Sequence, residues 1–400
     1  MNGRSLTSFW PVPLDDPYPA LARLRRQSPV HWLPALGAHL VVSHALAAEV
    51  LHGPDWSSDP TLSPRLASRL PTLTDQRLVA RSMLTSDPPG HTRLRRALSG
   101  WLTPRSVEGA RHRIGAIAAA ALAGHDGGET LNVMDDIAYP VPLAVMCELL
   151  DAPAELAIPL REETPRMAAL LDPLADAEGL QAGAEAAFSI LIELVPLVAQ
   201  RRDHPGPDLV SALAADSGGE AVLEADEVVL MLELLLAAGH ETTANLIGNA
   251  VAALHSHPGA ARILRHRPEQ LPAAVEEFLR YDSPVQLASR VARRDALLGE
   301  TVIGKGDQVL VALGAANRDP GAFTDPDSLD LGRQAQPHLA FGHGAHFCAG
   351  AALARVEAQE ILLRLLELTP PIEERGIAIK RGRSATFRRV EMLQLQEQGR

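Results

Sequence analysis

The sequence predicts a mainly α-helical protein with small β-sheets, an α+β fold class. Across most of the 400 residues, apolar side chains recur at the three- and four-residue spacing of amphipathic or buried helices. Stretches with the pattern of β-strands are few and short. Because 46% of the residues are hydrophobic, the chain is able to bury a large core.

Ten segments have helical periodicity: 17–27, 43–52, 90–101, 105–123, 141–150, 183–201, 225–255, 258–266, 269–281 and 351–368. Strands are expected at 31–33 and 38–42, at 288–291, 301–303 and 308–312, and in the tail at 377–380 and 391–394. The stretches 59–72 and 202–219 are predicted to be loops, and 315–350 a long irregular segment. No linker or repeat is evident, which indicates a single domain over residues 1–400, β-rich at about 30–45 and 285–315.

Composition narrows the class of protein. A net charge of -12 argues against binding nucleic acid through bulk charge. Two cysteines fit a reducing compartment better than a disulfide framework, and Cys147 lies in an apolar helical pattern typical of a small buried hydrophobe. No signal peptide and no uncharged apolar run of about 18 residues is apparent, so we expect a soluble, cytoplasmic protein without a membrane anchor.

The most informative stretch is the loop 341–350, FGHGAHFCAG, which leads into a predicted helix. Its cysteine, Cys348, lies just before the helix N-terminus, where the dipole and free N–H groups favour a thiolate. On this pattern alone the thiolate is either a nucleophile or a metal ligand. Zinc is a poor candidate metal, because no second cysteine lies nearby.

The residues around Cys348 suggest what carries the metal. Gly342 and Gly350 allow the backbone to approach a large flat group, and Phe341 supplies apolar cover. The pattern F-G-x-G-x-H-x-C-x-G resembles the haem-binding loop of cytochromes P450. The resemblance implies the cytochrome P450 fold, with haem b (iron protoporphyrin IX) between a long central helix and this loop, Cys348 as the ligand of the iron, and Phe341, Gly342 and Gly350 beside the haem.

A second motif interrupts the long apolar helix at 225–255. Ala238 and Gly239 leave room for a cofactor, and Thr242 is placed to donate to the carbonyl of Ala238, four residues back. Alternatively, Gly239 serves packing and Thr242 is satisfied within its own helix. The string A-G-x-E-T resembles the oxygen-binding segment of the same family. That resemblance implies that Glu241 and Thr242 help to deliver protons during O₂ activation, with Ala238 and Gly239 bordering the haem.

A third motif is the pair Glu277 and Arg280, which share a helix face three residues apart. Taken alone, it is equally a solvated surface pair. The E-x-x-R pair of the resembled family is a buried structural pair behind the haem, joined by a downstream basic residue. Ser328 stands where that family commonly has arginine, so Arg333 and His338 are the candidate substitutes.

A fourth group of residues is cationic. His91 and Arg95 are four residues apart on one helix face, and an isolated pair of this kind is typical of a solvated surface. Burying the two propionates of haem requires cationic or hydrogen-bonding partners. The resemblance assigns that role to His91 and Arg95, together with Arg290 and His346.

The resemblance implies a monooxygenase that hydroxylates or epoxidises a lipophilic organic substrate, with a natural-product role expected. Electrons must come from a separate partner, because no flavin, nucleotide or iron–sulfur motif is present. A ferredoxin or flavodoxin-type donor with its reductase is implied, and Arg93, Arg96, Arg105 and Arg355 are candidates for docking it or for ordinary solvated charge. The alternatives are oxidative coupling, decarboxylation or peroxide-driven chemistry, and, from another class, a non-catalytic haem-containing binding or recruitment domain.

By the same resemblance, the substrate pocket is lined from 61–86, 160–190, Ala237 and Ala238, 284–288 and 384–387. Aromatic residues make up 4% of the chain, which favours an aliphatic pocket. The 160–190 segment is expected to move as a lid, since substrate must reach a buried site. Asp172 and Arg161 are either polar substrate contacts or surface charge.

Overall fold

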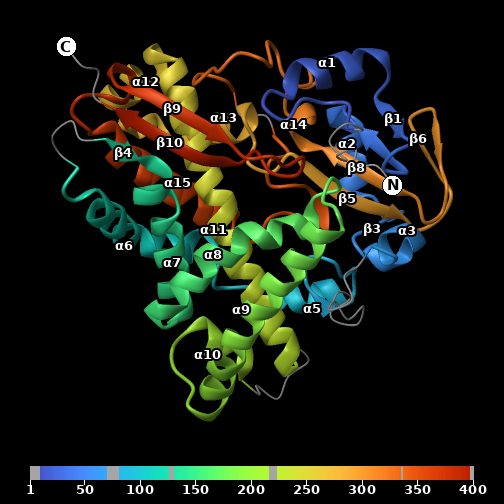
Figure 1. The fold of residues 1–400 in the computed structure, drawn as a ribbon, viewed down its shortest axis with the longest axis horizontal. Coiled ribbons are helices and arrows are strands. Elements are labelled where there is room, and N and C mark those ends of the chain that lie inside the picture. Colours follow the sequence, from blue (N-terminus) through green and yellow to red (C-terminus); the bar gives the residue numbers. More distant parts are fainter. Residues whose placement is uncertain (1–9, 70–80, 126–129, 216–222, 335–336, 397–400) are drawn as a thin grey trace.

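The computed structural model describes residues 10–69, 81–125, 130–215, 223–334 and 337–396 and confirms the mainly helical class (Figure 1). The longer helices are α1 Tyr18–Gln27, α2 His44–His52, α5 Gly90–Ala97, α6 Pro104–Leu122, α7 Pro140–Leu150, α8 Ala157–Met167, α9 Ala177–Asp203, α11 Ala225–Ser256, α12 Pro258–His266, α13 Leu271–Tyr281 and α15 Ala351–Leu366. Shorter ones are α3 Pro64–Ala67, α10 Leu209–Ala214 and α14 Leu313–Ala316. The loops predicted at 59–72 and 202–219 are therefore wrong in part, because α3 lies within the first and α10 within the second. Residues 70–72 lie outside the described residues.

Helix α11 passes through the middle of the molecule and contacts α7, α8, α9, α13 and α15 (Figure 1). Its start is fixed by a capping box, in which the side chains of Glu224 and Glu227 bond reciprocally to the backbone. Apolar residues cover almost every face of the helix, so it is stable only when surrounded. The other helices supply that surrounding, which places the middle of α11 deep in the protein.

A five-stranded sheet forms a second layer at one side of the helical body, where α1, α2 and α14 lie against it (Figure 1). Its strand order is β1 Val30–Leu33, β2 Ala38–Val41, β8 Gln308–Ala312, β5 Leu287–Ala292 and β3 Trp56–Ser57. Strands β2 and β8 run parallel, and the other pairs are antiparallel. Every residue of β2 and β8 is buried, as expected for the central strands of a covered sheet.

Two smaller sheets complete the fold. The tail strands β9 Gly376–Arg381 and β10 Val390–Gln396 pair as predicted, and β4 Leu131–Asn132 adds a third strand. The predicted strand at 301–303 is β7 Thr301–Ile303, but it pairs with β6 Ala296–Leu298 in a separate hairpin. The long segment 315–350 was predicted to be irregular. Its first two residues belong to α14, and the rest of its described part is irregular apart from a turn of 3₁₀ helix at Gly344–His346.

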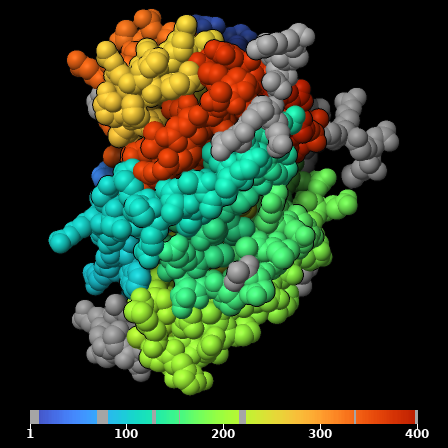
Figure 2. Space-filling model, turned by 90° about the vertical axis from the view of Figure 1, so that its left-hand side faces the viewer, coloured from blue at the N-terminus to red at the C-terminus, as the bar shows by residue number. Residues whose placement is uncertain are grey.

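Helix α9 is, among the described residues, the one helix long and apolar enough to cross a membrane by length and composition alone. It packs against α8, α10 and α11 and buries Ile190, Leu194 and Val198, as a helix of a folded core does. Figure 2 shows the face built largely from the middle of the chain, with α6 to α10 in cyan to yellow-green and the red C-terminal segments above them.

Candidate functional site

The loop 341–350 holds Cys348 half-buried, three residues before α15 begins. The Cys348 N–H donates to the carbonyl of Phe341 at 2.8 Å, which folds the loop back on itself, and the Gly350 N–H donates to the sulfur. Gly342 and Gly344 both have positive φ, at 71° and 74°. A side chain at Gly344 would also stand 2.9 Å from backbone atoms of α2. The glycines therefore allow a tight loop that is pressed against its neighbour and presents one thiol.

Burial raises the pKa of the Cys348 thiol, while the Gly350 N–H, Arg95 and Arg355 lower it by smaller amounts. This corrects the expectation that the helix N-terminus alone favours a thiolate. The physical reason is that removing the negative charge of the thiolate from water costs more free energy than these dipoles and distant guanidinium groups contribute by stabilising it. A bound metal cation supplies the missing compensation, since a coordinating thiol is deprotonated.

The wall behind the thiol is an aromatic and ionic stack. The Arg355 guanidinium lies over the Phe341 ring at 4.6 Å and bonds both oxygens of Glu276 at 2.6 and 2.8 Å. His338 bonds the same carboxylate at 3.2 Å and contacts the Phe341 ring. Burial raises the pKa of Glu276, but the bonds from Arg355 and His338 outweigh it and bring the pKa to about 2. Arg355 is thus committed to the loop and is not a free docking charge.

The pair Glu277 and Arg280 is buried, not solvated, with two bonds of 2.7 and 2.8 Å. Arg280 also donates to carbonyls of the irregular segment, at Asn317, Pro326 and Ser328. The third basic group is Arg333, whose Nε lies 3.2 Å from both Glu277 oxygens. Arg333 therefore replaces the arginine that the family commonly has at position 328, where this chain has serine. Its other hydrogen bonds, to backbone carbonyls, fix the segment that leads to Cys348.

The structure brings the four predicted propionate partners into one cluster. The rings of His91, from α5, and His346, from the loop, have centroids 4.1 Å apart. Arg290, from β5, and Arg95 lie close enough to lower the pKa of both histidines, although burial is the larger cause. His346 falls to a pKa of about 3, and its Nε2 has no hydrogen-bond partner among the described residues.

This cluster has an excess of positive charge. Burial lowers the pKa of Arg290 to about 10 against a modest opposing effect of Asp87. Asp87 is itself held by Arg293 at 2.5 Å and by Ser57. No ion pair joins Arg95 or Arg290 to any of the described residues, so these guanidinium groups lack a compensating carboxylate there. A ligand with two carboxylates, as haem has, would supply it.

On the α11 side, Thr242 donates to the carbonyl of Ala238 at 2.6 Å, which confirms the predicted bond. Ala238 is exposed although the helix is buried on either side of it, so its small side chain borders an open space. Gly239 points elsewhere, because an added Cβ would meet Met146 of α7 at 3.0 Å. The structure thus supports the packing interpretation of Gly239 and leaves Ala238 to face a cofactor.

Glu241 is buried and turned along α11. Its Oε1 lies 3.0 Å from Arg389 Nε and accepts a bond from Asn245 at 3.2 Å, whereas Oε2 has no partner among the described residues. Asn245 also accepts from the N–H of Val390, which anchors β10 to the same stripe of the helix. Sequence reasoning missed Arg389, because its partner is 148 positions away and no local pattern links the two.

His240 is a second residue that sequence reasoning passed over. It is fully buried, its ring packs against Tyr139 at 5.3 Å, and neither ring nitrogen has a partner among the residues the structure describes. Burial, with a smaller effect of Arg161, lowers the pKa of His240 to about 4. It is therefore neutral near pH 7, next to the buried charge of Glu241.

Four of the predicted pocket segments are tied together by hydrogen bonds. Arg69 donates to the carbonyls of Pro173 and Ala175. Asp172 accepts from the hydroxyl and N–H groups at the start of the turn 384–387, and the Gln286 N–H donates to the carbonyl of Thr386. Asp172 therefore holds the turn and is not free surface charge, while Arg161 pairs with Asp135 at 2.5 Å on the surface. Residues 70–80 of the predicted pocket lie outside the described residues.

The remaining docking candidates differ in their surroundings. Arg93 is bound to the buried carboxylate of Glu227 and is not a free charge. Arg96 and Arg105 are exposed, as predicted.

A mostly helical fold that sets a cysteine loop and an uncompensated cationic cluster beside the open stretch of a central helix defines a haem-binding protein. The comparisons with known proteins agree. A family model described as Cytochrome P450 matches residues 197–368. The chain is 43% identical over 293 residues to Cytochrome P450 107B1 of Saccharopolyspora erythraea, covering 72% of this chain and 70% of that protein.

A second relative, Cytochrome P450 monooxygenase PikC of Streptomyces venezuelae, is 40% identical over 366 residues, covering 89% of this chain and 85% of the relative. Among solved structures, P450BioI in complex with a hexadec-9Z-enoic acid-ligated acyl carrier protein superposes with a TM-score of 0.89. It is 33% identical and covers 96% of this chain and 99% of that one. The chain belongs to the cytochrome P450 family. It is an oxidoreductase of the monooxygenase class whose cofactor is haem.

Proposed function

We propose that this single-domain protein hydroxylates or epoxidises a lipophilic organic substrate in natural-product metabolism, using O₂ and electrons from a ferredoxin or flavodoxin-type donor and its reductase. Two relatives named for hydroxylation of vitamin D(3) and of 6-deoxyerythronolide B support a lipophilic substrate. The protein is proposed to act in the cytoplasm. The observation that carries the proposal is that the chain has both Cys348, to bind haem from the loop 341–350, and Glu241 with Thr242, to act on the proposed haem from α11.

Cys348 Sγ is proposed to bind the haem iron, and His91, Arg95, Arg290 and His346 to hold the propionates. Haem with a thiolate ligand supplies the chemistry of O₂ activation, because the thiolate pushes electron density that favours O–O cleavage. The Gly350 N–H orients the sulfur, and the stack of Arg355 on Phe341 keeps water from that side.

Protons are proposed to come from the α11 side. The Thr242 hydroxyl already donates to Ala238, so its oxygen is left to accept a hydrogen bond at the open stretch of the helix. Glu241 Oε2 has no described partner and is the atom from which a proton can be passed on. Arg389 holds Oε1 and so keeps the carboxylate in place between turnovers.

The test uses the haem-loaded protein with a surrogate ferredoxin and reductase. Lipophilic natural products are first screened for a shift of the haem Soret band, and a binder is then turned over under ¹⁸O₂. We expect one ¹⁸O atom in each product molecule and a much slower reaction in Glu241→Gln with the substrate-induced shift retained. Product without ¹⁸O, or product that forms only with peroxide, would contradict the proposal.

A further inference from the structure

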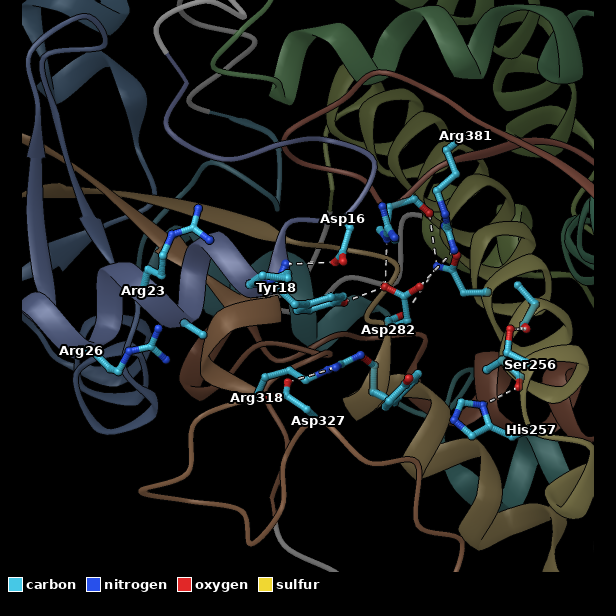
Figure 3. Close-up of a pocket in the computed structure, with 17 residues that line it drawn as sticks. Asp16, Tyr18, Arg23, Arg26, Ser256, His257, Asp282, Arg318, Asp327 and Arg381 are labelled. Atoms are coloured by element: carbon cyan, nitrogen blue, oxygen red, sulfur yellow. Dashed lines mark hydrogen bonds and ion pairs between the residues drawn. The ribbon is translucent and has the colours of Figure 1, made fainter.

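A cavity of about 620 Å³ lies between α1, the C-terminal half of α11, the end of α13 and strand β9 (Figure 3). None of the residues assigned above to the haem lines it. Its position and lining therefore call for an explanation of their own.

The lining is cationic although the protein is acidic. Five arginines face three aspartates around the cavity, whereas the whole chain has a net charge of -12. The acidic groups are all engaged: Asp16 accepts the N–H of Tyr18, Asp327 accepts from Arg318, and Asp282 lies between two arginines. A metal cation is thus a poor occupant, and an anion is a good one.

The inner wall is rigid and shares one carboxylate between two guanidinium groups. Asp282 accepts from Tyr18 at 2.6 Å, from Arg388 at 3.0 Å and from Arg381 at 3.3 Å. Burial lowers the pKa of Arg381, and Asp282 opposes that effect only in part. The wall therefore carries one positive charge more than its carboxylate neutralises.

The outer edge adds two free charges. Arg23 and Arg26 are three residues apart on α1, so they share a face of that helix. Both are exposed, and no hydrogen bond or ion pair joins either to another described residue. In the close-up, no dashed line joins either side chain to the other residues drawn (Figure 3). Two exposed guanidinium groups opposite a buried cationic wall can approach one ligand from two sides.

The rest of the lining is small or flat. Ala22, Ala252 and Ala253 leave room beside the charges. Arg318 is held between the rings of Tyr18 and Tyr281, at 4.0 and 3.9 Å, and forms a fixed side of the cavity. A ligand with a compact apolar part next to its anionic group would contact both kinds of surface.

We propose that this cavity binds a small organic phosphate, with the phosphate between Arg23, Arg26 and Arg381 and the apolar part against the alanines of α1 and α11. The site is separate from the haem, so it does not depend on the function proposed above. The cavity is connected to the proposed haem site through Asn249 of α11. This residue accepts a hydrogen bond from Arg381 at 2.7 Å and lies two turns along the helix from Glu241.

The test is calorimetric titration of the haem-loaded protein with phenyl phosphate and with inorganic phosphate, at matched ionic strength. We expect saturable binding of phenyl phosphate at one site, tighter than that of inorganic phosphate, with no shift of the Soret band. Arg23→Ala/Arg26→Ala should weaken it by about tenfold or more, because two charge-assisted contacts are lost.

The matched control is Arg105→Ala/Arg267→Ala, which removes two exposed arginines outside the cavity and should leave binding unchanged. The proposal is overturned if phenyl phosphate does not saturate, if it shifts the Soret band, if the control loses as much affinity as the α1 variant, or if inorganic phosphate binds equally well.

Discussion

Glu241 of α11, which is buried, and Arg389, the half-buried residue before β10, form an ion pair with 3.0 Å between Oε1 and Nε. The pair joins the helix beside the haem to the C-terminal sheet. Arg389 lies two residues after the turn 384–387, which hydrogen bonds to Asp172 hold in place. A substrate that contacts this turn is therefore close to the group proposed to move protons.

Replacing Arg389 with leucine should destabilise the protein by about 3 kcal/mol, because it leaves the Glu241 carboxylate buried without its cation. Urea unfolding followed by circular dichroism measures the loss. Glu241→Gln/Arg389→Leu should recover much of it, since the charge is then removed as well. If the double variant is as unstable as the sum of the single variants, the pair does not couple as described.

His240 should make the protein sensitive to acid. Its pKa of about 4 in the folded state is below the unfolded value of about 6.5, so the unfolded chain binds more protons. The contribution of neutral His240 to the free energy of unfolding is fully present above pH 6.5. It is lost as the pH falls toward 4, by about 3 kcal/mol in all. Unfolding of His240→Phe between pH 7 and 4.5 should show a shallower decline than the parent. Equal slopes would show that His240 titrates normally.

Arg333→Ala should lower stability by about 2 kcal/mol, because Glu277 loses one of its two cations and the carbonyls of Thr324 and Asp325 lose their donor. Ser328→Arg in that variant should restore part of the lost stability, because it places a basic residue where the cytochrome P450 family commonly has arginine. Arg166→Ala, which breaks the exposed pair with Glu163, is the control and should change stability by less than about 0.5 kcal/mol. An equal loss of stability in both alanine variants would contradict the role of Arg333 as the second cation of Glu277.

Arg290→Met should weaken haem retention by about tenfold, because a half-buried guanidinium that is proposed to bind a propionate is lost. Haem transfer to an excess of apomyoglobin gives the dissociation rate. Arg96→Ala, on the same helix as Arg95 but exposed, should release haem at the parental rate. Unchanged retention in Arg290→Met would place the propionates elsewhere.

Local patterns predicted the parts of the site that lie within one segment. The bounds of α11, the bond from Thr242 to Ala238 and the face shared by Glu277 and Arg280 all follow from helical periodicity. What local patterns could not predict depends on distant packing. Gly239 faces Met146 because of how α7 crosses α11, and Arg389 reaches Glu241 only once β10 has docked. Strand β4 is two residues long, too short to leave an alternating pattern.

The expectation about Cys348 failed for a related reason. The sequence shows a helix N-terminus after the cysteine, which favours a thiolate, but not how far the folded chain removes the thiol from water. Arg355 was interpreted as either a docking charge or ordinary solvated charge, because nothing local reveals Glu276, 79 positions away, as its partner. Burial and long-range pairing are properties of the folded chain, and both changed the interpretation of single residues.

The most direct test of the central claim is the carbon monoxide difference spectrum of the reduced, haem-loaded protein and of two cysteine variants. The parent and Cys147→Ala, which alters only a buried apolar position on α7, should both show the red-shifted Soret band of thiolate-ligated haem. Cys348→Ala should lose that band. A red-shifted band that persists in Cys348→Ala, or one that is lost in Cys147→Ala instead, would contradict the assignment of Cys348 as the ligand.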